Sequence, residues 1–90
     1  MYDLEITEEA VKIFKKLAKK NRKQLEIIDK KNQEIREAPI GYKFLRTPLH
    51  GFNRVHIDTH FVLVFDVDHE HRLVTIYYFD HHDNVYRWRP

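Results

Sequence analysis

The pattern of apolar and polar positions divides the chain into a short strand, two helices and a group of later strands. Residues 2–6 alternate apolar and acidic side chains, which is the period of a half-buried strand. From Glu8 to Lys20 apolar residues recur at helical spacing behind Thr7, a residue type that caps helices. A second helical period runs from Arg22 to Glu37, and Asn21 between them can adopt the left-handed conformation that ends a helix. The pattern therefore predicts a strand followed by an antiparallel helical hairpin.

After Gly51 the pattern changes to the two-residue period of strands. Three strands are expected, at Asn53–Asp58, Phe61–Asp68 and Arg72–Phe79. The middle strand is apolar on both faces, as in the centre of a sheet, and the polar turn at 68–71 makes its neighbour antiparallel. For the last segment, Asp80–Trp88, we expect a short helical turn that places His82 and Tyr86 on one face.

These elements predict one α+β domain over residues 1–90. Its parts are an N-terminal strand, a helical hairpin, a three-stranded antiparallel meander and a short C-terminal helical turn. Alternate side chains of a strand point to opposite faces of the sheet. If Val55 and Ile57 pack under the helices, Arg54 and His56 therefore project together from the other, partly open face.

Charge is distributed unevenly although the net charge is only +2. Residues 1–50 carry 12 Lys and Arg against 8 Asp and Glu, residues 51–90 carry 4 against 6, and six of the seven histidines follow residue 50. The basic half favours a polyanionic partner, although a solvated helix surface also explains its lysines. No cysteine, no signal peptide and no apolar run of the roughly 20 residues that span a membrane are present, so we expect a cytoplasmic protein without membrane contact.

The late histidines suggest two kinds of chemistry. Imidazole and carboxylate bind zinc, and two groups of such residues are present. His56, Asp58 and His60 alternate along the chain, and His81, His82 and Asp83 cluster later, so a metal-dependent nuclease or hydrolase that uses the first group is one hypothesis. A hairpin turn is expected near His60, however, and no established zinc spacing is present, so we expect neither a metal nor another cofactor.

Acid–base catalysis is the second hypothesis, because an unperturbed imidazole titrates at about 6.5. Cleavage of RNA needs a base for the ribose 2′-OH, cationic groups for the phosphate and an acid for the leaving 5′-oxygen. His56, Arg54 and His82 could supply these three groups.

The order and spacing of the segments resemble the RelE/ParE superfamily of toxins from toxin–antitoxin systems. The most telling parts are Leu49 and Gly51, the strand RVHID, the central strand FVLVFDV, and a late histidine followed four residues later by an aromatic residue. The resemblance covers essentially the whole chain. It implies a RelE-like fold and the toxin component of a type II system, which enters the ribosomal A site and cuts mRNA without a metal, with the 2′-OH as nucleophile. ParE relatives share the fold but inhibit DNA gyrase, so a non-nucleolytic toxin or an inactive binding homologue is the alternative.

Within the superfamily the chain is similar to the histidine-using YafQ branch. A histidine on the first hairpin strand of that branch matches His56, an acidic turn residue falls at His60, and the late histidine and aromatic residue match His82 and Tyr86. The resemblance therefore implies catalytic roles for these four residues. RelE itself carries a catalytic arginine on the central strand, where this chain has Val62, so the lysine and arginine mechanism of RelE is not expected.

The resemblance also implies a set of residues that bind RNA or its phosphates. These residues are Arg54, Arg46, Lys43 and His50. The implied partners are a RelB-like antitoxin, the ribosome and mRNA. The aromatic C-terminus, with Tyr86 and Trp88, is either a docking surface for the antitoxin or an ordinary closure of the core.

Overall fold

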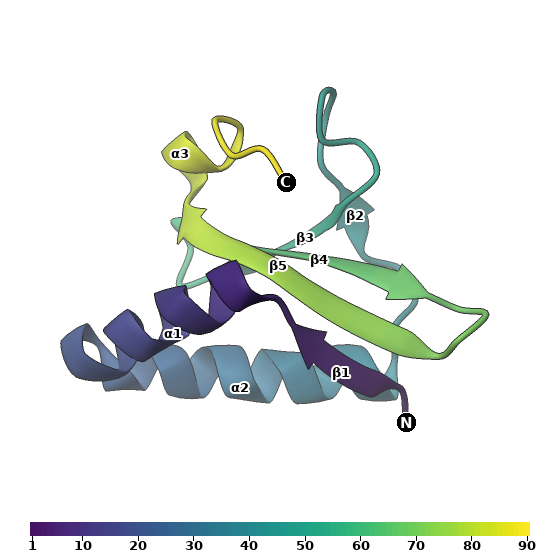
Figure 1. Ribbon diagram of the computed structural model, residues 1–90, viewed down its shortest axis with the longest axis horizontal. Coiled ribbons are helices and arrows are strands. Elements are labelled where there is room, and N and C mark those ends of the chain that lie inside the picture. Colours follow the sequence, from purple (N-terminus) through teal and green to yellow (C-terminus); the bar gives the residue numbers. More distant parts are fainter.

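The computed structural model describes all 90 residues and contains one five-stranded sheet with two helices packed on one face (Figure 1). Along the chain the elements are β1 (Asp3–Ile6), α1 (Glu8–Lys20), α2 (Arg22–Glu37), β2 (Lys43–Phe44), β3 (Asn53–Ile57), β4 (Phe61–Asp68), β5 (Leu73–His81) and α3 (His82–Val85). The strand order is β1-β5-β4-β3-β2, with β1 parallel to β5 and the other pairs antiparallel. The predicted α+β fold is confirmed. None of the helices is long and apolar enough to cross a membrane.

The two long helices begin at side-chain caps. Thr7 accepts a hydrogen bond from the Ala10 N–H at 3.2 Å and begins α1. Asn21 does not adopt the predicted left-handed conformation, since its φ is −153°. Its side chain instead accepts a hydrogen bond from the Gln24 N–H at 3.1 Å and begins α2. A single residue separates the two helices, and a short amide side chain is a strong N-cap, so Asn21 serves the helix that follows it.

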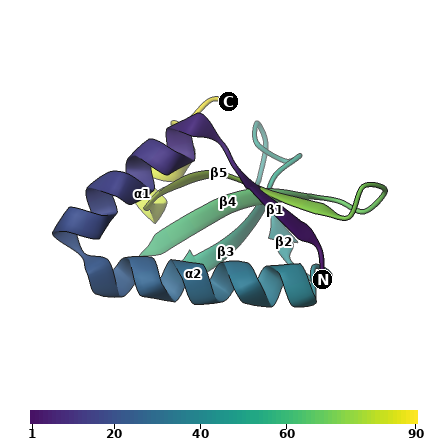
Figure 2. The same ribbon diagram turned by 60° about the horizontal axis from the view of Figure 1, so that its bottom comes forward.

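The helices cover one face of the sheet and enclose what we call the helix-side core, as the turned view shows (Figure 2). This core consists of Ala10, Ile28, Ile35, Ile57, Leu63, Phe65, Val74, Ile76 and Phe79. On the inner side of α2, Gln24 and Asn32 are buried together with Ile28 and Ile35, while Leu25 is only half-buried. The helix therefore presents a more polar surface to the sheet than the apolar pattern predicts.

A smaller group of buried residues, the open-side core, lies on the opposite face. It consists of Leu45, Leu49, Val62, Val64, Val85 and Trp88. The Trp88 ring stacks on Tyr78 with 5.2 Å between centroids, and its Nε1 donates a hydrogen bond to Glu9 Oε1 at 2.9 Å. With only 7% of its surface exposed, Trp88 closes the core, and the prediction of a docking surface at Trp88 is wrong.

The strands differ from the predicted ones in three main respects. Strand β3 ends before Asp58, because Asp58 and Thr59 have positive φ values of 49° and 65° and form a tight turn. Strand β5 reaches His81, because its ladder with β4 extends to the pair Phe61 and His81. The two-residue strand β2 has no pattern of its own and forms only through its pairing with β3. The predicted helical turn is present as α3.

Candidate functional site

An open hollow of about 510 Å³ lies on the open face of the sheet. We call it the site hollow; its lining residues are Leu45, Arg46, Arg54, His56, Val62, His82, Asp83, Val85 and Tyr86. They come from the segment after β2, from β3 and β4, and from α3 with the residue after it. The hollow thus joins parts of the chain that lie far apart in the sequence, and five ionisable or cationic side chains expected at the site line it.

The floor of the site hollow is set by the pairing of β3 with β4. The register places Arg54 opposite Val64 and His56 opposite Val62. Val62 and Val64 are buried, whereas Arg54 is half-buried and His56 is exposed. The alternation of side chains therefore brings a guanidinium and an imidazole onto one apolar floor, as the sequence predicted.

Tyr86 and Arg46 form one wall of the site hollow. The Tyr86 hydroxyl accepts a hydrogen bond from the Arg46 backbone N–H at 3.1 Å, and the Arg46 guanidinium lies 5.0 Å from the centre of the Tyr86 ring. Burial acts to raise the pKa of the Tyr86 hydroxyl, but the hydrogen bonds and charge of Arg46, with the charge of Arg54, outweigh it and lower that pKa below its usual value of 10.0. The surroundings thus favour negative charge at this point, which is also what a phosphate would bring.

His82 also lines the site hollow, as the first residue of α3. Its Nδ1 lies 2.9 Å from Asp83 Oδ1. A carboxylate at Nδ1 favours the tautomer that carries the proton there, so Nε2 keeps a free lone pair. Sequence reasoning grouped Asp83 with His81 and His82 only as a possible metal cluster and did not assign it to the catalytic site.

The other expected site residues lie outside the lining of the site hollow. Lys43 lines a neighbouring hollow of about 400 Å³ that shares Arg54 and His56 with the first, so it extends the basic surface. His50 is exposed and lines neither of them. His60 lies beside His82, with 6.1 Å between ring centroids. Direct roles for His50 and His60 stay predictions.

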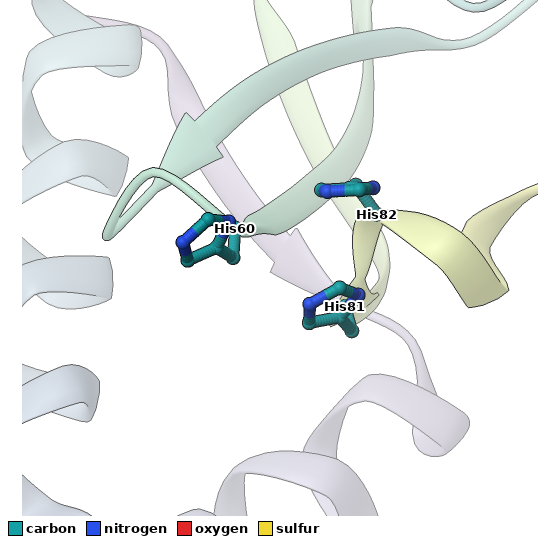
Figure 3. Close-up of side chains that lie close together, drawn as sticks. All are labelled: His60, His81 and His82. Atoms are coloured by element: carbon teal, nitrogen blue, oxygen red, sulfur yellow. The ribbon is translucent and has the colours of Figure 1, made fainter.

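The grouping of His56, Asp58 and His60 considered for a metal does not form. Asp58 lies in the turn after β3, and its carboxylate accepts a hydrogen bond from Gln24 Nε2 of α2 at 3.3 Å. His60 instead lies close to His81 and His82, the histidines at the junction of β5 and α3 (Figure 3).

The fold has a close counterpart among solved structures. The toxin–antitoxin complex RelBE2 from Mycobacterium tuberculosis contains a chain that superposes with a TM-score of 0.75 over 89% of this chain and 96% of that one, at 24% identity. The class defined by this architecture is therefore that of the small α+β proteins in which a helical hairpin covers one face of a five-stranded sheet.

Sequence comparison narrows the class. No family model matches the chain. A protein of Methanosarcina mazei without assigned function is 56% identical over 86 residues, 96% of this chain and 100% of that protein. The protein named "Putative toxin RelE4" of Methanocaldococcus jannaschii is 51% identical over 87 residues, 97% of this chain and 93% of that protein. At this identity over nearly the full length, the chain belongs to the RelE toxin superfamily. Its place in the histidine-using branch stays a prediction.

Proposed function

We propose that this toxin is a ribosome-dependent mRNA endonuclease that needs no metal. The observation that carries the proposal is the convergence of two histidines, two arginines and a tyrosine on one open hollow. These residues are His56, His82, Arg46, Arg54 and Tyr86. Imidazoles can move protons near neutral pH, and arginines bind phosphate, so the set meets the chemical needs of RNA cleavage. Membership of the RelE superfamily supports the same activity.

In the proposed reaction, His56 accepts the proton of the ribose 2′-OH as the 2′-oxygen attacks phosphorus. The bond between phosphorus and the 5′-oxygen breaks, and His82, acting in its imidazolium form with Asp83 at Nδ1, gives the proton on Nε2 to that leaving oxygen. The products are a 2′,3′-cyclic phosphate and a free 5′-OH. Arg54 and Arg46 offset the charge that develops on the phosphate oxygens.

Tyr86 would stack against a base of the bound RNA, because its ring borders the site hollow and its hydroxyl is already held by Arg46. Lys43 and the exposed lysines of α1 would add sequence-independent attraction to ribosomal RNA. A substrate on the ribosome places the toxin in the cytoplasm. Because the solved counterpart is a complex with an antitoxin, we include a RelB-like antitoxin among the partners of this chain.

The test is cleavage of mRNA on purified ribosomes, mapped by primer extension. We expect wild-type protein to cut within the A-site codon, and His56→Gln and His82→Gln to lower the rate by about 10²–10⁴-fold, the usual contribution of a general base or acid. His69→Ala, which changes an exposed histidine of the β4–β5 turn, serves as the control and should cut at the wild-type rate.

Full cleavage by both glutamine variants would contradict the assignment of the two histidines. Growth arrest by the wild type without any mRNA cuts would contradict the nuclease function. A DNA supercoiling assay would then show whether the toxin inhibits gyrase instead.

A further inference from the structure

Three histidines gather beside the site hollow, and only one of them lines it. His60 lies in the turn after β3, His81 is the last residue of β5, and His82 begins α3 (Figure 3). One ring nitrogen from each lies within 4.8 Å of those of the other two. The His60 and His81 rings are stacked, with 6.0 Å between centroids and 11° between planes, and 4.5 Å separates the centroids of His81 and His82.

The backbone fixes this grouping. The His82 N–H donates a hydrogen bond to the His60 carbonyl oxygen at 2.8 Å, and Phe61, the residue after His60, pairs with His81 in the β4–β5 ladder. Backbone hydrogen bonds therefore hold the three histidines next to one another, and only their side-chain torsions are free to change. His60 and His82 are exposed, so their rings can rotate without disturbing the core.

The chemistry of the cluster suits a transition metal. Three imidazoles with an open fourth position form a known tetrahedral arrangement for zinc, with Zn–N distances of about 2.0–2.1 Å. Such distances bring ligand nitrogens to about 3.4 Å from each other, so the rings need to close by about 1 Å from their present positions. Imidazole favours zinc, copper and nickel, whereas magnesium and calcium prefer oxygen ligands.

Asp83 gives His82 the carboxylate partner that metal-binding histidines commonly have at the ring nitrogen turned away from the metal. One of its oxygens lies 2.9 Å from His82 Nδ1, whereas His81 Nδ1 accepts a hydrogen bond from the Asp83 N–H at 3.2 Å. A carboxylate in this position orients the ring, increases the basicity of the nitrogen that faces the metal and offsets part of the metal's charge.

We propose that His60, His81 and His82 bind a divalent transition metal of the zinc class and that the bound metal stops RNA cleavage. The second part rests on the proposed function, because the metal would occupy the lone pair of His82 and remove its ability to carry a proton. The first part does not depend on the function. The toxin would thus need no metal for activity and would be inhibited by one.

Calorimetric titration of the untagged protein with ZnCl₂ tests the binding. We expect one zinc per wild-type chain, at least 10-fold weaker binding to His81→Asn and His60→Ala, and no binding of Mg²⁺. His81→Asn is a conservative change, because His81 caps α3 through its Nδ1 and asparagine is an equally good N-cap. His71→Ala is the control, since His71 belongs to a separate exposed group with Asp68 and Glu70 and its loss should leave zinc binding unchanged.

Absence of zinc binding by the wild type, equal binding by His81→Asn, or loss of binding in His71→Ala would each overturn the site. The inhibition is tested by ribosome cleavage with added zinc and with a zinc-selective chelator, both at the magnesium concentration that keeps the ribosome intact. We expect zinc to lower the wild-type rate at least 10-fold and to leave His81→Asn unaffected. If zinc binds but both proteins cut equally in zinc, the inhibition is wrong. If the wild type makes no cuts in the zinc-selective chelator, the proposed function and the inhibition fail together, while calorimetry still decides the metal site.

Discussion

The two faces of the sheet are made by the same strands, yet they are closed to different degrees. On one face the helices cover nine core residues, none more than 6% exposed. On the other face the C-terminal segment and the loop after β2 cover six residues and leave the site hollow open beside them. A chain of 90 residues can bury only a limited apolar surface. In this protein the open face has fewer buried apolar residues than the face under the helices.

Because the two faces are closed to different degrees, alternate residues of one strand serve different purposes: some stabilise the fold and others line the site hollow. In β3, Ile57 belongs to the helix-side core while Arg54 and His56 line the site hollow. In β4, Leu63 and Phe65 face the helices while Val62 forms part of the floor of the hollow. Substitutions on the helix-covered face should therefore change the free energy of unfolding, whereas substitutions in the hollow should change function at nearly constant stability.

Phe65→Ala should have the largest effect on stability. Phe65 is fully buried, and the ring of Tyr42 meets it edge-on at 5.3 Å. Removing a buried aromatic ring costs about 3–5 kcal/mol of the free energy of unfolding, which is a large part of the total for a small domain. Urea unfolding followed by circular dichroism measures this loss. A cost below about 1 kcal/mol would contradict the division of roles between the faces.

Glu9→Ala tests the link between the two faces. Glu9 belongs to α1, but its carboxylate accepts the hydrogen bond of Trp88 in the open-side core. We expect a loss of about 1.5–3 kcal/mol, the usual value for a hydrogen bond to a charged group. Trp88 is the only tryptophan, so its fluorescence reports on this core during unfolding.

Glu8→Ala is the matched control for Glu9→Ala. Glu8 lies in the same first turn, is exposed and pairs only with Lys12 at 3.8 Å. Its replacement should cost no more than about 0.5 kcal/mol. Equal costs for the two variants would show that the helix terminus, and not Trp88, accounts for the effect of Glu9.

The elements with local signals could be predicted from the sequence. Both long helices begin and end at the predicted residues, because their cap residues and apolar periods depend only on residues close together in the sequence. Strand β2 could not be predicted, since Lys43 and Phe44 become a strand only by pairing with residues about ten positions later. The conformation of Asn21 was not predicted, because this single residue lies between two helices and could have served as the C-cap of α1 or as the N-cap of α2.

In the site, too, only the residues with a local sequence signal could be placed in advance. The positions of Arg54 and His56 follow from strand alternation, and those of His82 and Tyr86 from a helical turn. The histidine cluster does not follow from either, because the left-handed turn at Asp58 and Thr59 redirects the chain before His60. The β4–β5 register, which shifts at a bulge between residues 64 and 65, then decides which residues lie opposite. A turn near His60 was expected, but neither its left-handed geometry nor the bulge has a local sequence signal.

Asn32→Leu should stabilise the helix-covered face. Asn32 is 5% exposed, and its Oδ1 is buried without a hydrogen-bond partner. Leucine has the same branched skeleton, removes the desolvated oxygen and favours the helix, so we expect a gain of about 1 kcal/mol. Thermal and urea unfolding measure it. Gln33→Leu, at the exposed neighbouring position, should change stability by less than about 0.5 kcal/mol, and an equal gain there would point to helix propensity alone.

The smallest effect on stability is expected for Tyr86→Phe. Tyr86 lies in the open part of the open face, and Tyr78 lies in the closed part of the same face. Tyr78 lies under Trp88 and donates a hydrogen bond to Asp80 at 2.7 Å; burial, with this bond, raises its pKa to about 12. Tyr86 lies beside Arg46, which lowers its pKa below 10.0 despite partial burial. The contribution of Tyr78 to stability is therefore present below pH 10 and is lost as the pH rises toward 12. That of Tyr86 grows as the pH rises through its lowered pKa and is complete above 10.

Ultraviolet titration at 295 nm separates the two groups. Tyr86→Phe should remove the earliest step of tyrosine ionisation and Tyr78→Phe the latest, while Tyr86→Phe changes the free energy of unfolding at pH 7 by no more than about 0.5 kcal/mol. If the step lost in Tyr86→Phe lies above pH 10, Arg46 does not favour negative charge at this wall. The site hollow would then lack the electrostatic feature that distinguishes it from the closed part of the same face.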